Sequence, residues 1–133
     1  MHMWVENGRI KVLLVDDISI NRKVAQNMLH KLGCECDMVQ NGSEAVDAVL
    51  GGDYDLVLMD CLMPVMDGYE ATLQIRRCEG KARQTPIVAL TAAVMDEDRQ
   101  KCLDVGMNDI IAKPLSISNL RVIISNYVGH LLA

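Results

Sequence analysis

The sequence predicts a single α/β domain with a doubly wound sheet of five parallel strands and helices on both faces. Five short apolar runs alternate with stretches of helical periodicity, which is typical of this fold class. Four of the runs are almost continuously apolar, as expected of parallel strands covered on both faces. Because crossovers between parallel strands are right-handed, five strands that alternate with five helices are expected to form a doubly wound fold.

The predicted strands are short runs of strand length: Lys11–Val15, Cys34–Val39, Leu56–Met59, Ile87–Leu90 and Ile110–Ala112. The second strand differs from the others because apolar and acidic residues alternate in Cys34–Met38. This alternation predicts one wet side and a place at the edge of the sheet.

Helical periodicity fills the intervals between these strands. The first helix is predicted from apolar residues at every fourth position, two more beside them and a glycine cap: Ile20, Val24, Met28, Leu32, Ala25, Leu29 and Gly33. Asn41 with Glu44, and Asp67 with Glu70, have capping-box spacing and open the second and third helices. The buried face predicted for the second helix is Ala45, Val46 and Val49. The later helices are expected over Tyr69–Cys78, over Asp96–Val105 and from Ser118, the last with Leu120, Ile124, Tyr127 and Leu131 inward.

Composition bounds the possible functions. The chain has 133 residues, enough for one domain with its own core, and a formal net charge of -5 without a basic stripe, which argues against nucleic acid. Its apolar runs are shorter than a membrane span and no signal peptide opens it, so we expect a cytoplasmic domain without membrane contact. The five Cys are expected to be reduced thiols. Residues 1–9 are expected to be a leader of linker or vector origin, and residues 10–133 the domain.

Polar residues follow four of the five predicted strands. They are Asp16 and Asp17 after the first strand, Asp60 after the third, Thr91 after the fourth, and Lys113 with Pro114 after the fifth. Taken singly, each is an ordinary turn, strand or surface residue. Because the carboxyl ends of parallel strands share one edge, however, we expect these side chains to converge there.

The expected group of side chains indicates phosphoryl chemistry. Three carboxylates repel one another unless a cation is bound, and oxygen ligands select Mg²⁺, for which Mn²⁺ is expected to substitute. The chain lacks a glycine-rich phosphate cradle, but a lysine and a threonine can hold the oxygens of one phosphoryl group. One aspartate can then act as nucleophile and form an acyl phosphate.

The segments "VLLVDD", "DLVLMDCLMPVMDGYEA", "PIVALTA" and "AKPL" make the chain similar to the receiver domain of two-component response regulators. The likeness covers residues 10 to about 130, and "NRKVA" and "KLGC" resemble receivers within hybrid sensor histidine kinases. The resemblance implies a phosphoacceptor domain that takes a phosphoryl group from the phosphohistidine of a kinase or phosphotransfer domain. It also implies the strand order 2-1-3-4-5 of a flavodoxin-like sheet, and a domain that catalyses its own modification and is no stand-alone enzyme.

The same resemblance implies a role for each matching residue. Asp60 would be the phosphoacceptor and a metal ligand, Asp17 a direct ligand, and Asp16 a ligand through water. The backbone carbonyl of Leu62 would complete the set of metal ligands from the protein. Lys113 would pair with the acceptor and then with the phosphate.

The remaining roles belong to a switch. Thr91 would contact the phosphoryl group, and Pro114 would aim the loop through a cis peptide. Ile110 stands where many receivers carry Tyr or Phe, so the aromatic half of the switch is missing. Leu62 and Ala93 are apolar where polar side chains can place a hydrolytic water, which predicts slow self-dephosphorylation.

Three other functions remain as alternatives at this point. A degenerate receiver would act only as an interaction module, although all five site residues are present. An aspartate-nucleophile phosphatase of the haloacid-dehalogenase type needs a second Asp where this chain has Leu62. A flavodoxin-like cofactor binder needs a hydroxyl-rich first loop, where Asp16 and Asp17 would repel a phosphate.

Overall fold

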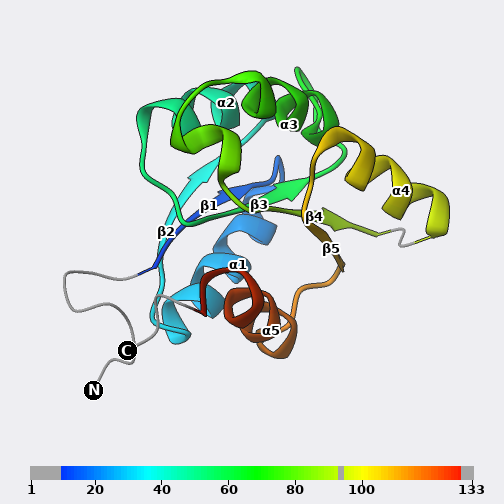
Figure 1. Ribbon diagram of the computed structural model, residues 1–133. Helices are drawn as coiled ribbons and strands as arrows, with labels where there is room; N and C mark the ends of the chain where they lie inside the picture. The colour runs from blue at the N-terminus through cyan, green and yellow to red at the C-terminus, as the bar shows by residue number, and fades with distance from the viewer. Residues whose placement is uncertain (1–9, 93–94, 130–133) are drawn as a thin grey trace.

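The computed structural model describes residues 10–92 and 95–129. Five parallel strands form one sheet in the order β2-β1-β3-β4-β5, which confirms the predicted fold class (Figure 1). The strands are β1 (Lys11–Val15), β2 (Glu35–Val39), β3 (Leu56–Asp60), β4 (Ile87–Thr91) and β5 (Asp109–Ala112). As predicted, β2 lies at one edge of the sheet.

Helices cover both faces of this sheet. They are α1 (Ser19–Lys31), α2 (Gly42–Gly51), α3 (Gly68–Arg77), α4 (Asp96–Val105) and α5 (Ile117–Val128), with a 3-10 turn, η1 (Lys81–Gln84), that the sequence did not predict. α1 and α5 lie on one face, and α2, α3 and α4 lie on the other (Figure 1). Each face has its own buried apolar cluster, so the alternating side chains of every central strand are covered.

The strand boundaries differ from the prediction by one residue at four ends. β2 begins at Glu35 because the N–H of Cys34 donates to the carbonyl of Leu29 and completes the end of α1. β3 and β4 extend to Asp60 and Thr91 because the ladder pairs these residues with neighbouring strands. Two of the functional side chains therefore stand on the last residue of a strand rather than on a loop. β5 likewise begins one residue early.

The capping predictions are confirmed. Asn41 accepts the backbone N–H of Glu44 at 2.9 Å, and Asp67 accepts that of Glu70 at 2.9 Å. Gly33 has a φ of 84°, the left-handed conformation expected of a residue after a helix.

The apolar stripe predicted for α1 is only partly buried. Ala25 and Leu29 are buried, whereas Ile20 and Val24 are 64% and 45% exposed. With 3.6 residues per turn, positions four apart rotate by about 40° at each step, so an every-fourth pattern winds around the helix. The apolar stripe on α1 is therefore covered mainly over its second half.

The predicted inner face of α2 is buried, and so are Leu120 and Ile124 on the predicted inner face of α5. Tyr127 is half-buried, and Leu131 lies outside the described residues. Among the helices that the structure describes, none is both long and apolar enough to cross a bilayer.

Candidate functional site: an acidic cluster at the strand ends

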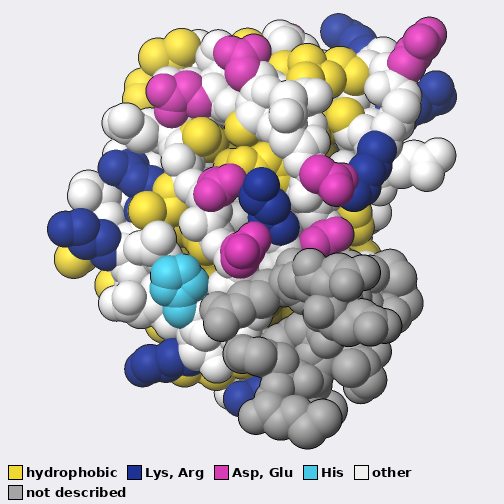
Figure 2. Space-filling model, turned by 90° about the vertical axis from the view of Figure 1, so that its left-hand side faces the viewer, with side chains coloured by type: hydrophobic (Ala, Val, Ile, Leu, Met, Phe, Trp, Pro, Cys, Tyr) yellow, Lys and Arg dark blue, Asp and Glu magenta, His cyan; other side chains and the backbone are white. Residues whose placement is uncertain are grey.

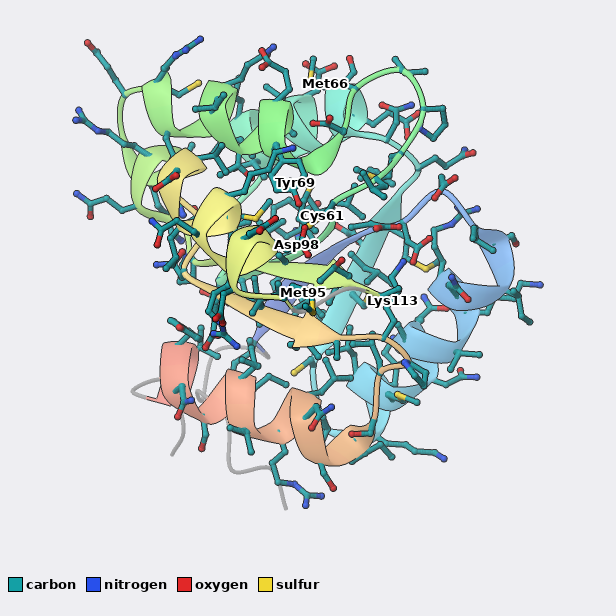
Figure 3. The ribbon with its side chains drawn as sticks, turned by 90° about the vertical axis from the view of Figure 1, so that its right-hand side faces the viewer. Cys61, Met66, Tyr69, Met95, Asp98 and Lys113 are labelled. Atoms are coloured by element: carbon teal, nitrogen blue, oxygen red, sulfur yellow. The ribbon has the colours of Figure 1, made fainter. Side chains whose placement is uncertain are left out.

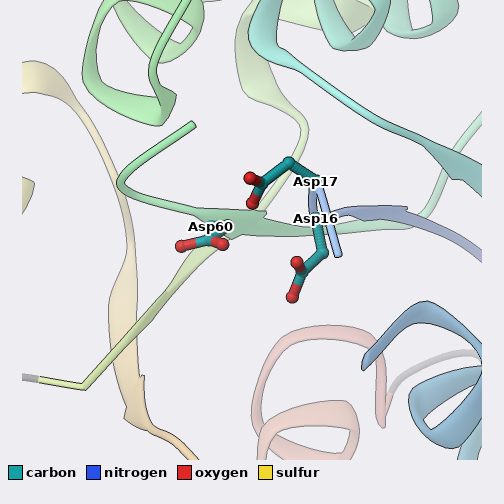
Figure 4. Close-up of side chains that lie close together, drawn as sticks. All are labelled: Asp16, Asp17 and Asp60. Carbon is teal, nitrogen blue, oxygen red and sulfur yellow. The ribbon is translucent and has the colours of Figure 1, made fainter. Parts of the chain in front are cut away.

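Three carboxylates converge at the carboxyl ends of the central strands. Asp16 and Asp17 follow β1, and Asp60 ends the adjacent strand β3, because Val15 pairs with Met59 in the ladder. One oxygen from each carboxylate lies within 4.8 Å of the other two (Figure 4). Asp16 and Asp60 are only 3% and 5% exposed, so two of the three charges are held away from bulk water.

Lys113 supplies positive charge to this acidic cluster. Its Nζ lies 2.9 Å from Oδ2 of Asp60 and 3.7 Å from Oδ2 of Asp16. The backbone N–H of Lys113 donates to the carbonyl of Thr91 at 2.8 Å, which fixes the start of the loop against β4. The Lys113–Pro114 peptide is cis, as the resemblance implied.

The ionisation of Asp60 and Lys113 reflects their burial and mutual contact. The pKa of Asp60 is raised, mainly by burial. The hydrogen bond and the charge of Lys113 lower this pKa, and the neighbouring charge of Asp16 raises it further. Burial alone would lower the pKa of Lys113, but its hydrogen bond to Asp60 and the charges of Asp60 and Asp16 raise it overall. The lysine therefore stays charged, while the acidic cluster remains short of positive charge.

Backbone groups hold the carboxylates in place. The N–H of Leu62 donates to Oδ1 of Asp60 at 3.3 Å, and the N–H of Ile18 donates to Oδ1 of Asp16 at 2.9 Å. Arg22 Nη1 donates to the backbone carbonyl of Asp16 at 2.8 Å. The sequence analysis missed Arg22 because its position on α1 gave no signal that its side chain returns to the end of β1.

A glycine allows α3 to start close to Asp60. A Cβ on Gly68 would lie 2.2 Å from the backbone carbonyl of Asp60, far inside van der Waals contact. The N–H of Gly68 donates to the carbonyl of Cys61. The glycine that follows Asp67 is therefore required for the close approach of α3 to the end of β3.

The structure brings together most of the predicted site residues. Thr91 ends β4 directly after Leu90, the residue that pairs with Asp60. Leu62 presents its side chain to solvent with 74% exposure. Ile110 lies on β5, is 8% exposed and belongs to the apolar cluster that also contains Cys102 of α4. Ala93 lies outside the described residues.

A cavity of about 310 Å³ adjoins the acidic cluster. It is lined by residues of β1, α1, β4 and the two loops that follow β1 and β5: Leu14, Asp16, Asn21, Val24, Ala25, Leu90, Lys113, Pro114 and Leu115. Val24, from the exposed half of the α1 stripe, therefore lines this cavity.

The donor set fits a small divalent cation. Among the described residues, Asp16, Asp17 and Asp60 are the only group of three ligating side chains close enough to share an ion. All three offer oxygen, which suits Mg²⁺ better than zinc or copper.

The geometry of the acidic cluster agrees with the protein family that the chain matches. The response regulator receiver domain family matches residues 12–125. The chain belongs to this family. It is a receiver domain of the kind found in two-component and phosphorelay signalling, and the phosphatase and flavodoxin-like alternatives are not favoured.

Individual relatives show that the chain is similar to receiver domains of histidine kinases. The chain is 42% identical over 120 residues to hybrid signal transduction histidine kinase G of Dictyostelium discoideum, covering 89% of this chain and 4% of that protein. Its structure resembles the receiver domain of sensor histidine kinase PA1611 from Pseudomonas aeruginosa, solved with magnesium in the active site cleft. That match has a TM-score of 0.84 and 43% identity, and covers 92% of this chain and 98% of the other.

A third relative was solved with a partner. The receiver domain of Saccharomyces cerevisiae Ssk1, in complex with the histidine phosphotransfer protein Ypd1, matches with a TM-score of 0.84 and 32% identity. The match covers 94% of this chain and 93% of that one. The chain spans only 4% to 16% of the length of the curated kinases it resembles.

Proposed function

We propose that this receiver domain takes a phosphoryl group from a phosphohistidine onto Asp60 in a reaction that it catalyses itself and that depends on a divalent cation. The observation that carries the proposal is the convergence of three carboxylates and Lys113 at one rim, with Lys113 Nζ 2.9 Å from the Asp60 carboxylate. The domain comprises residues 10–133 in this proposal.

Asp60, Lys113 and Thr91 each have a separate role in this reaction. A carboxylate oxygen of Asp60 attacks the phosphorus, the phosphorus–nitrogen bond to the donor breaks, and the imidazole leaves with its electron pair and takes up a proton. Lys113 neutralises oxygens of the transferred group, and Thr91 donates a hydrogen bond to one of them. The contact between Lys113 and Asp60 holds the nucleophile in place before the donor arrives.

Mg²⁺ would be held by Asp17, Asp60 and the backbone carbonyl of Leu62, with Asp16 acting through water, and Mn²⁺ would substitute for it. When bound, the ion supplies charge neutralisation between carboxylates and phosphoryl oxygens. The excess of three carboxylates over one ammonium supports this assignment.

The partner that we propose is a histidine kinase or a histidine phosphotransfer domain. The identity to hybrid kinases and the likeness to a receiver solved with Ypd1 support it. Switching at Thr91 without an aromatic partner at Ile110 suits a relay domain that passes the group onward.

The test is incubation with acetyl phosphate or beryllofluoride, with and without Mg²⁺, followed by intact mass and NMR. Asp60→Asn should abolish Mg²⁺-dependent labelling. Asp55→Asn is a matched control, because Asp55 lies directly before the same strand at its other end. Labelling that survives Asp60→Asn, or that needs no metal, would overturn the proposal.

A further inference from the structure

Two cysteines meet beneath α4, beside the acceptor residue. Cys61 directly follows Asp60, and Cys102 lies on α4. Their side chains are 1% and 2% exposed and belong to one apolar cluster. The two thiols and the hydroxyl of Tyr69 are hydrogen-bonding partners, so the sulfur atoms are close neighbours.

The position of Cys61 follows from the pleat of β3. Asp60 faces the rim, and the next side chain along an extended chain points to the opposite side. Cys61 therefore joins the cluster on the α2–α3 face, as expected from the sequence, and Figure 3 shows it beside Tyr69.

α4 is held to the rest of the domain by few contacts. Cys102 is its only buried residue, and no side chain caps its N-terminus. A cation–π contact adds to this, with Lys101 Nζ 4.2 Å from the centre of the Tyr69 ring. Elements with few buried contacts open at a low free-energy cost, and opening of α4 would uncover both thiols together.

We infer that Cys61 and Cys102 form an oxidisable dithiol that closes into a disulfide and staples α4 to the strand that carries the acceptor. With hydrogen peroxide as oxidant, one thiol becomes a sulfenic acid and releases one water. The second thiol then attacks that sulfur, forms the S–S bond and releases a second water. The two thiols lose two protons and two electrons, and the peroxide is reduced to two waters.

The closed structure protects the dithiol. The two thiols are only 1% and 2% exposed, so peroxide does not reach them while α4 is packed. Oxidation therefore requires α4 to open. The rate of oxidation reports how often α4 separates from the rest of the domain. The disulfide in turn holds the helix closed.

The other three cysteines provide internal controls. Cys34 precedes β2, Cys36 lies within it, and Cys78 follows α3, where its thiol donates to the carbonyl of Gln74 at 3.2 Å. Cys36 and Cys78 are half-buried, so they are more accessible than either member of the pair.

The test uses the intact chain, reduced and then treated with hydrogen peroxide, with remaining thiols alkylated before digestion without reductant. We expect a peptide pair that joins Cys61 to Cys102, lighter than the two reduced peptides by two hydrogen atoms. Cys61→Ala and Cys102→Ala should abolish the link, whereas Cys78→Ala and Asp60→Asn should retain it. The link therefore fails or survives independently of the phosphorylation proposal.

Hydrogen exchange provides a second readout that does not depend on variants folding normally. Amides of residues 96–105 should exchange several-fold more slowly after oxidation of the wild type. Sulfinic acid at Cys61 with Cys102 still reduced, links that involve only Cys36 or Cys78, or unchanged exchange in α4 would each overturn the inference.

Discussion

Acidic side chains gather at both ends of the sheet, but they are neutralised in different ways. Toward the amino ends, three aspartates each have a separate partner. Asp55 accepts the N–H of Lys11 at 2.8 Å, Asp37 accepts the hydroxyl of Tyr54 at 2.7 Å, and Asp53 pairs with a lysine of η1. Figure 2 looks onto this face, where Lys and Arg side chains lie among those of Asp and Glu.

At the carboxyl ends, the carboxylates face one another. Asp16, Asp17 and Asp60 converge within 4.8 Å, and Lys113 is the cation that contacts two of them. The view in Figure 3 shows this end of the sheet, with Lys113 labelled. Aspartates therefore make separate hydrogen bonds and ion pairs toward the amino ends, whereas at the carboxyl ends they leave negative charge that suits a cation.

The largest expected effect tests whether only the carboxyl end binds a divalent cation. Asp17→Asn removes a charged oxygen ligand and should weaken Mg²⁺ binding by about 10-fold or more, which corresponds to about 1.4 kcal/mol. Asp53→Asn at the amino end should leave the affinity unchanged. Isothermal titration calorimetry measures both, and equal effects of the two variants would remove the distinction between the ends.

The next largest expected effect is on the rate at which the phosphoryl group on Asp60 is hydrolysed. Leu62→Asn should speed loss of the phosphoryl group from Asp60 several-fold, because an amide beside the acceptor can hold an attacking water. Leu50→Asn is the control, since Leu50 is also exposed but lies on α2. Decay is followed by mass spectrometry after removal of acetyl phosphate, and an unchanged or slower decay for Leu62→Asn would contradict the prediction.

Stability should respond with opposite signs at the two ends. In EDTA, Asp17→Asn should raise the free energy of unfolding by about 0.5 kcal/mol, because it relieves repulsion between partly screened charges. Asp55→Asn should lower it by about 1–2 kcal/mol, because it weakens a charge-assisted hydrogen bond to a backbone N–H. Urea unfolding measures both, and the comparison fails if the two changes share a sign.

The smallest effect concerns backbone strain beside the acceptor. Val65 has a φ of 70°, which is costly for a β-branched residue, and its side chain is 85% exposed. Val65→Gly should raise the free energy of unfolding by about 0.5 kcal/mol after the entropy cost of glycine. Val122→Gly, at an exposed site within α5, should lower it by about 1 kcal/mol. Thermal melts distinguish the two, and a loss of stability at Val65 would argue against strain there.

Local patterns predicted most of the fold. The five strands, the caps at Asn41 and Asp67, and the edge position of β2 all follow from hydrophobic period and capping chemistry within a few residues. The partly exposed stripe of α1 did not, because periodicity shows that a helix has an apolar side without showing how much of that side the sheet covers.

The candidate site was likewise predicted in part from the sequence and decided in part by the tertiary structure. Order along the chain and the geometry of parallel strands determined that Asp16, Asp60 and Lys113 would reach one rim. Only the tertiary structure decided which carboxylates receive their own partners and which crowd one lysine, since Asp55 and Asp60 lie at opposite ends of one strand. It alone brought Cys61 against Cys102, because contacts between residues distant in the chain depend on how α4 packs, which no local pattern encodes.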